Sequence, residues 1–120
     1  MFLDFNSDIP IYLQVSHYIE DGILKDIFKE ESQIPSTTEI SVNYKVNPAT
    51  VAKGFNLLVE EGIIYKKRGV GMFVGEGAKS KLKEKRRETF YNSYIKGLLE
   101  EAKKLDISIE EIIKMIERSG

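Results

Sequence analysis

The chain has 120 residues, of which 42% are hydrophobic and 31% charged, and its formal net charge is −1; this is typical of a globular chain with one domain, or one domain and a short appendage. The absence of cysteine excludes disulfides, thiolate metal sites and cysteine nucleophiles, and the single histidine, His17, excludes chemistry built on paired histidines. No apolar run approaches the roughly 18 residues that cross a bilayer, and the N-terminal residues MFLDFNSDIP lack the basic region of a signal peptide, so we expect a cytoplasmic protein with no metal, cofactor or membrane partner.

A first amphipathic helix is predicted over residues 10–25. Pro10 suits the first turn of a helix, where a missing N–H costs nothing. Apolar residues follow at a spacing of three to four, at Tyr12, Val15, Ile19 and Ile23. The charged segment that follows ends at Pro35 and is predicted to be a loop, with room for a short strand at 33–34.

Two closely spaced helices are predicted next, over 37–44 and from 48 to about 61. Ser36 or Thr37 supplies the first N-cap, and Glu39 lies three residues after Ser36 in the register of a capping box. Asn47 is a good N-cap and Pro48 a good first helical residue, which marks the second start sharply. The apolar stripe of the second helix is Val51, Phe55 and Leu58.

A β-hairpin is predicted after Gly62, which ends the second helix in the C′ position. Its strands cover 63–67 and 72–75, and its turn contains the sequence KKRGVG, residues 66–71. Residues 65–75 carry three positive charges and no negative charge. Taken alone, such a turn is typical of any solvated hairpin tip.

The sequence GEGAKS, residues 75–80, is a break in composition and predicts a domain boundary. A long helix with a broad apolar stripe follows, and Asp106-Ile107 ends it. Ser108 caps a last helix, with Glu111 in the capping-box position. The fold class predicted for the whole chain is therefore mostly α with a small β-hairpin.

The order of helix, turn, helix and hairpin indicates a winged helix-turn-helix domain over residues 1–75, in which the second helix enters the DNA major groove. We expect a linker at 76–79 and a two-helix dimerisation arm over 80–120. Small or polar residues occupy the face of the second helix opposite its apolar stripe. Thr50 and Asn56 can hydrogen-bond to bases, and Lys53 can reach a phosphate or a guanine. The alternatives are a Thr50 hydroxyl satisfied by local backbone and a Lys53 that is ordinary surface charge.

In this setting the basic hairpin is predicted to be a DNA-facing wing. Its cations would lie along the phosphates, and Gly69 and Gly71 would allow the backbone to pass close to the duplex. The complete set of predicted DNA contacts is Ser36, Thr38, Asn47, Pro48, Ala49, Thr50, Lys53, Asn56, Lys66, Lys67, Arg68, Gly69 and Gly71.

The stretch QIPSTTEISVNYKVNPATVAKGFNLLVEEGIIYKKRGVGMFV resembles the N-terminal domain of the GntR family of bacterial transcription regulators. That family has L-P-S-x-R-x-L-A, V-[ST]-R-x-T-V-x-x-A-L, G-[LI]-[IV] and R-x-G-x-G-[TS]-[FY]-V, preceded by an opening like the PIYLQV of residues 10–15. The resemblance covers residues 10–75, and the sequence V-N-P-x-T-V with a short helical C-terminus resembles the YtrA-like branch. It implies a DNA-binding regulator, and repression is inferred from the family alone.

The sequence departs from the family pattern at three places. Thr38 replaces an arginine that follows P-S-x, Pro48 replaces an arginine at the start of the recognition helix, and Ala52 stands where many members have a basic residue. We expect these changes to alter affinity or sequence preference without changing the fold.

The C-terminal helices carry more apolar surface than one winged helix can cover, which predicts a two-fold dimer and, from two recognition helices on one DNA face, a palindromic operator. The predicted dimerisation residues are Leu82, Phe90, Tyr91, Tyr94, Ile95, Leu98, Leu99, Leu105, Ile109, Ile112, Ile113 and Ile116. The aromatic residues 90, 91 and 94 are either core or the lining of a small-molecule effector pocket. The basic run 79–88 is either a solvated helix face or an additional phosphate anchor.

Together these patterns predict a sequence-specific, dimeric DNA-binding regulator. The alternative, favoured by the net charge of −1 and by Thr38, is a winged helix that binds another protein instead of DNA. No acid–base pair or activated nucleophile indicates an enzyme.

Overall fold

The structure, a computed structural model, describes residues 3–120. It contains the helices α1 (Ile11–Leu24), α2 (Thr37–Tyr44) and α3 (Pro48–Glu60), the antiparallel strands β1 (Ile64–Lys67) and β2 (Gly71–Val74), and the helical segments α4 (Ala78–Phe90), η1 (Tyr91–Ile95), α5 (Lys96–Lys104) and α6 (Ile109–Ser119). The predicted class, mostly α with one small hairpin, is confirmed. The contacts divide the chain into one compact unit that ends at Lys83 and a second, Glu84–Gly120.

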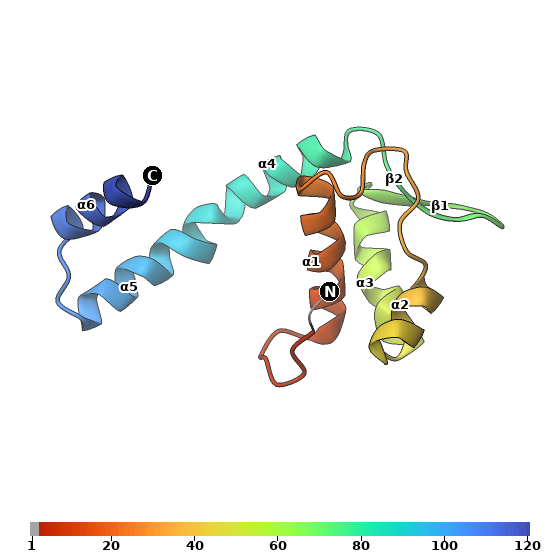
Figure 1. Ribbon diagram of the computed structural model, residues 1–120, viewed down its shortest axis with the longest axis horizontal. Coiled ribbons are helices and arrows are strands. Elements are labelled where there is room, and N and C mark those ends of the chain that lie inside the picture. The colour runs from red at the N-terminus through yellow and green to blue at the C-terminus, as the bar shows by residue number, and fades with distance from the viewer. Residues whose placement is uncertain (1–2) are drawn as a thin grey trace. The chain divides into compact units, whose positions relative to one another are not determined.

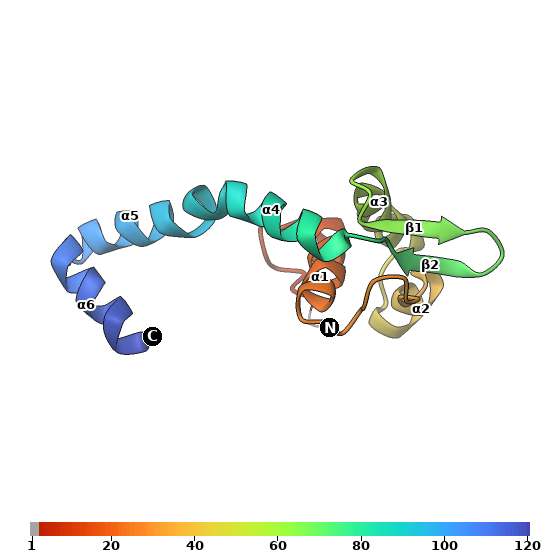
Figure 2. The same cartoon turned by 90° about the horizontal axis from the view of Figure 1, so that it is seen from above.

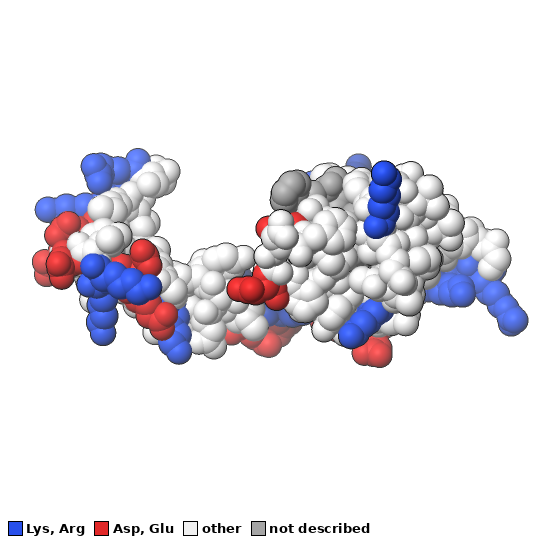
Figure 3. All heavy atoms as spheres, turned by 90° about the horizontal axis from the view of Figure 1, so that it is seen from below, with Lys and Arg blue, Asp and Glu red and all other residues white. Residues whose placement is uncertain are grey.

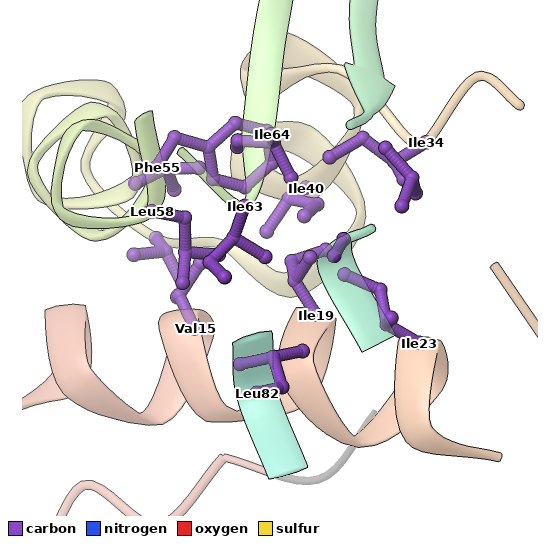
Figure 4. Packing of buried hydrophobic residues seen from close by; sticks show 14 residues of the cluster. Val15, Ile19, Ile23, Ile34, Ile40, Phe55, Leu58, Ile63, Ile64 and Leu82 are labelled. Carbon is purple, nitrogen blue, oxygen red and sulfur yellow. The ribbon is translucent and has the colours of Figure 1, made fainter. Parts of the chain in front are cut away.

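The core of the first unit lies between α1, α3 and the hairpin, and α2 packs against α3 (Figure 1). Apolar side chains from α1 and α3 point toward one another and meet those of the first strand (Figure 4). The residues of this core that are exposed by 2% or less include Val15, Ile19, Ile23, Ile34, Ile40, Val51, Phe55, Leu58, Ile63, Ile64 and Val74. The stripe predicted for α3 faces the core, and so do Val15, Ile19 and Ile23 of the stripe predicted for α1, whereas Tyr12 of that stripe is only half-buried.

Gly54 lets α1 and α3 approach closely. A Cβ atom at this position would lie 2.5 Å from the carbonyl oxygen of Tyr12 and 3.3 Å from Cβ of Val15. The backbone of α1 thus occupies the space that any side chain at residue 54 would need.

The ends of α2 and α3 follow from capping. The Ser36 hydroxyl accepts a hydrogen bond from the Glu39 amide at 2.9 Å, while the Glu39 carboxylate accepts one from the Ser36 amide at 3.2 Å. Asn47 accepts a bond from the Ala49 amide at 2.8 Å, and Pro48 is the first helical residue. These bonds satisfy amides that the first turn leaves without helical partners. The predicted starts of both helices are confirmed.

The hairpin pairs Ile64 with Val74 and Lys67 with Gly71, so its strands begin and end within a residue of the predicted ones. It projects away from the three helices of the first unit (Figure 2). Gly62, with φ of +73°, takes the chain from α3 into β1. The turn of the hairpin, residues 68–70, consequently lies at the end of the hairpin that is far from α1, α2 and α3.

The first turns of α4 belong to the core of the first unit. Ala78 and Leu82 are fully buried in it, and Lys79 forms an ion pair of 2.9 Å with Asp26. The prediction that Leu82 lies on a dimerisation surface is therefore wrong, because its side chain fills the core instead of a free helix face. The loop that precedes α4 is also shorter than the predicted linker, since the helix begins at Ala78.

The second unit contains the remainder of the chain. The predicted long helix is continuous through α4, η1 and α5, with η1 a stretch of π-helix within it, and it ends before Asp106, which takes φ of +56°. Ser108 caps α6 by accepting a hydrogen bond from the Glu111 amide at 3.1 Å, as predicted. Within this unit Ala102 and Ile112 are buried, whereas most other large apolar side chains are exposed.

Candidate nucleic-acid interface

Helix α3 has one buried face and one exposed face. Val51 and Phe55 are buried, and Ala49, Lys53 and Asn56 are exposed. Thr50 is half-buried, and the two residues that begin the helix, Asn47 and Pro48, are exposed. The exposed face and the helix start together present side chains that can hydrogen-bond to bases and phosphates. The side-chain oxygen Oδ1 of Asn47 already accepts the capping bond from the Ala49 amide.

The Lys53 ammonium does not extend freely from α3. It lies 4.0 Å from the centre of the Tyr12 ring, which belongs to the first turn of α1. A cation is attracted to the face of an aromatic ring, so Tyr12 holds Lys53 near the start of α1. Sequence reasoning missed Tyr12, because the two residues are far apart in the chain and only the packing of α1 on α3 brings them together.

The predicted contacts on α2 lie at its first turn. Ser36 is half-buried and its hydroxyl oxygen caps the helix, while Thr38 is exposed. The Thr38 hydroxyl can donate a hydrogen bond to a phosphate, but it lacks the charge of the arginine in the family pattern, and the Glu39 carboxylate already occupies the positive end of this helix.

The cations of the hairpin are exposed. Lys66, Lys67 and Arg68 lie at the end of β1, and basic side chains gather at the end of the hairpin, at the right of Figure 3. Lys67 Nζ lies 4.3 Å from the centre of the Phe73 ring on β2. In this part of the molecule a basic surface exists although the whole chain is slightly acidic.

The two glycines of the hairpin have different surroundings. Gly69, with φ of +77°, has no atom within 4 Å of where a Cβ would lie, so it serves the turn conformation. At Gly71, with φ of +146°, a Cβ would lie 2.5 Å from the side-chain nitrogen of Gln33. Gly71 therefore leaves room for another side chain of the same molecule.

At the base of the hairpin, the Tyr65 hydroxyl donates a hydrogen bond of 2.9 Å to the Glu31 carboxylate. This bond raises the pKa of Tyr65 above its ordinary value, because the hydroxyl must keep its proton to donate. The Tyr65 ring stacks on Phe73 with centroids 5.9 Å apart. The base of the hairpin is thus joined to the loop that precedes α2.

The basic run 79–88 is partly used within the first unit. Lys79 pairs with Asp26, and Lys81 Nζ donates to the Gly62 carbonyl at 3.3 Å. These two cations hold the start of α4 against neighbouring loops. An additional phosphate anchor later in the run stays a prediction.

Among residues 3–120 we find no group of acidic or histidine side chains that could hold a metal ion. Over the same residues, no helix has both the length and the apolar character needed to cross a membrane.

Comparison with known proteins decides the family. Residues 11–74 match the family model of "Bacterial regulatory proteins, gntR family". The chain belongs to the GntR family. Its matched segment covers all of the helix-turn-helix and the hairpin, so the resemblance noted in the sequence is confirmed, and the chain is a DNA-binding transcription regulator by family.

Similarity to GntR proteins continues beyond this segment. The HTH-type transcriptional repressor YtrA of Bacillus subtilis is 32% identical over 114 residues, which are 95% of this chain and 87% of YtrA. A GntR-family transcriptional regulator from Listeria monocytogenes is 27% identical, with a TM-score of 0.74 over 95% of this chain and 98% of that one. The winged helix with a C-terminal helical region is therefore a fold that GntR regulators share.

A third relative has been solved with DNA. The structure of AraR(DBD) in complex with operator ORX1 is 28% identical to this chain, with a TM-score of 0.56, and the match covers 62% of this chain and 93% of that one. The family description and the name of YtrA both refer to transcription regulation.

Proposed function

We propose that this GntR-family chain is a dimeric repressor that binds a palindromic operator in the cytoplasm. Two comparisons support it. YtrA, which is similar over nearly the whole chain, is a transcriptional repressor, and the AraR domain, which matches 62% of this chain, was solved in complex with an operator. The observation on this chain that carries the proposal is the exposed polar face of α3, which shares one compact unit with an exposed basic hairpin.

The two elements would divide the work of recognition. Lys67 and Arg68 on the wing contact phosphates, which fixes the protein on the duplex without reading sequence. Thr50, Lys53 and Asn56 on α3 contact base edges in the major groove. The exposed Thr38 side chain at the start of α2 adds a hydrogen-bond donor for a phosphate beside α3.

Self-association would use the second unit, Glu84–Gly120. The apolar side chains predicted to form the dimer contact are largely exposed in the single chain; Tyr94 is exposed by 65%, Ile109 by 66% and Ile116 by 57%. A groove of about 560 Å³ between α5 and α6 is lined by Leu98, Ala102, Leu105, Ile112, Met115 and Ile116, among others. A second copy of the chain that fills this groove would bury apolar surface, and removal of apolar surface from water is favourable.

The residue limits of the DNA-binding domain and of the dimerisation arm are also part of the proposal. A DNA-binding domain over 1–75 and an arm over 80–120 are the predicted limits, and the burial of Ala78 and Leu82 favours an extension of the first part to about residue 83. A small-molecule effector bound among Phe90, Tyr91 and Tyr94 stays a prediction.

Selection of DNA fragments from the source genome by the purified chain tests the function. We expect a recurring fragment that contains an inverted repeat, with half-site centres about one helical turn apart or a multiple of this distance. Recovery of no enriched fragment, or of fragments without an inverted repeat, would contradict the proposal. Binding to a protein partner without any shift of DNA would favour the alternative of an interaction module.

Substitutions then test the division of work. The K67A/R68A double variant should bind operator and random DNA about 10- to 100-fold more weakly, with the salt slope reduced by about two. Thr50→Ala should instead change the preferred bases. The K103A/K104A variant removes the same charge from α5 and serves as the matched control. If K67A/R68A and K103A/K104A weakened DNA binding equally, only the net charge of the chain would matter for affinity.

A further inference from the structure

An extended segment, residues 31–34, lies along β2 on the side away from β1 and forms an isolated β-bridge with it. It is joined to β2 by backbone hydrogen bonds of 2.8–3.0 Å, from Glu31 N to Val74 O, from Val74 N to Ser32 O and from Ile34 N to Met72 O. Gln33 forms an isolated antiparallel bridge with Phe73. Because Ser36, the cap of α2, follows two residues after this segment, the segment connects the hairpin with the helix-turn-helix.

The side chain of Gln33 reaches further along the hairpin than its backbone does. Gln33 Nε2 donates a hydrogen bond of 3.0 Å to the carbonyl oxygen of Val70. Val70 lies in the turn, directly after Arg68 and Gly69, and its amide donates to the Lys67 carbonyl at 2.9 Å. One amide group from the loop before α2 is thus attached to the turn that carries the wing cations.

We propose that Gln33 is a positioning residue for the DNA-facing wing, an inference that rests on the proposed function. Its amide fixes the turn at residues 68–70, so that the neighbouring cations are held where they meet phosphates.

The geometry at Gly71 supports this role. The place of a Cβ at residue 71 is occupied by the Gln33 amide, at 2.5 Å, and φ there is +146°. A side chain at residue 71 would displace Gln33 from the turn. The second glycine of the GVG sequence is therefore needed for an intramolecular contact, and not only for close passage of DNA.

The chemistry of the contact also suits a wing. A two-stranded hairpin is marginal by itself, and cations that move freely lose entropy when DNA immobilises them. A neutral amide donor can hold the turn without placing a negative charge among the basic side chains. A carboxylate at the same place would compete with phosphate for Lys67 and Arg68.

The other contacts of the hairpin act elsewhere. The bond from Tyr65 to Glu31 lies at the base of the strands, and the Lys67 ammonium rests on Phe73. The hydrogen bond from Gln33, in contrast, reaches the turn itself. Loss of the Gln33 amide should therefore loosen the turn and leave the base of the hairpin in place.

The test uses Gln33→Met, which keeps the length of the side chain and removes the donor. Gln14→Met is the matched control, because the Gln14 amide also joins two distant parts of the backbone, donating to the carbonyls of Asp4 and Ile9 at 2.9 Å, but at the start of α1. Amide hydrogen exchange without DNA is measured first. Exchange at Val70 should become about tenfold faster in Q33M and stay unchanged in Q14M.

DNA affinity is then measured between 50 and 200 mM salt, on a selected fragment and on random DNA. Q33M should raise Kd about five- to tenfold on both and reduce the salt slope by about one. Arg68→Ala should cost less in the Q33M background than in the wild type, because an unfixed cation contributes less. A purely structural role would leave the salt slope and the effect of R68A unchanged.

The outcomes separate the two proposals. Wild-type protein that retains no DNA fragment would refute the proposed function, and the inference with it. Wild-type binding combined with additive effects of Q33M and R68A would overturn the inference alone. Unchanged exchange at Val70 in Q33M would also overturn it, since the amide would then not hold the turn.

Discussion

Leu82 provides a sharp test of where the first unit ends. Its side chain is fully buried, although it lies on a helix that continues into the second unit. Leu82→Ala removes three buried carbon atoms, worth about 0.8 kcal/mol each by transfer from water. The cavity that remains raises the expected loss in the free energy of unfolding to about 3 kcal/mol.

Leu98→Ala is the matched control, because it makes the same change on α5 at a side chain that is 42% exposed. Urea denaturation at a fixed protein concentration measures the stability of both variants, and sedimentation measures their mass. We expect L82A to lose stability with its mass unchanged. The free energy of unfolding of the L98A chain should fall by less than about 1 kcal/mol. The L98A dimer should be weaker than the wild-type dimer, so that on dilution it dissociates at a higher protein concentration.

The opposite pattern would refute this reasoning. If L82A kept its urea midpoint and lost the dimer, Leu82 would be an interface residue, and the winged helix would end before α4. If both variants lost the same stability, the core of the first unit and the surface of the second could not be told apart by burial.

Three further changes have defined outcomes. Ser36→Ala should lower the free energy of unfolding by about 1 kcal/mol, measured by urea denaturation, because it removes the cap of α2; no loss would mean that the capping bond is not formed in solution. The hydrogen bond and ion pair with Lys79 lower the pKa of Asp26 in the folded chain. The ion pair therefore stabilises the fold fully above the pKa that Asp26 has in the unfolded chain, and this stabilisation disappears as the pH falls through the lower pKa of the folded chain. Asp26→Asn should accordingly be less stable than the wild type at neutral pH and equal to it in strong acid, and a difference that grows with acidification would contradict the sign. Tyr12→Leu should release Lys53 and weaken operator binding about two- to fivefold, while Tyr12→Phe keeps the ring; equal Kd values for the two variants would show that the ring face plays no part.

Helix starts were predictable from sequence because their signals are local. Ser36 with Glu39, Asn47 with Pro48, and Ser108 each specify a backbone geometry within three or four residues. The structure places the caps at these positions. The order of the capped helices before a hairpin then indicated the fold, and the motifs indicated the family.

The contacts that organise the candidate site were not predictable in this way. Tyr12 meets Lys53, and Gln33 meets Val70 across 37 residues of sequence. Neither pair has a local pattern, because packing of separate elements brings each together. Leu82 was misassigned for the same reason, since apolar periodicity marks a helix face but does not say what covers it.

The π-helical stretch within the long C-terminal helix was not predicted, although the helix itself was. Apolar residues continue through 90–99 at spacings compatible with one regular helix. The π-helical stretch Tyr91–Ile95 contains no proline or glycine that would announce it. A widened turn of this kind has no strong signature in a single sequence.

Gly54 has a consequence for how this protein can change during evolution. Glycine in the middle of a helix costs about 1 kcal/mol relative to alanine, yet here alanine would collide with the backbone of α1 at Tyr12. Any larger residue must push α3 away from α1, and because Lys53 is the adjacent residue, its ammonium would move away from the Tyr12 ring as well. Under the proposed function, new operator preferences are therefore easier to reach by exchanging side chains on the outer face of α3 than by changing how closely α3 packs on α1.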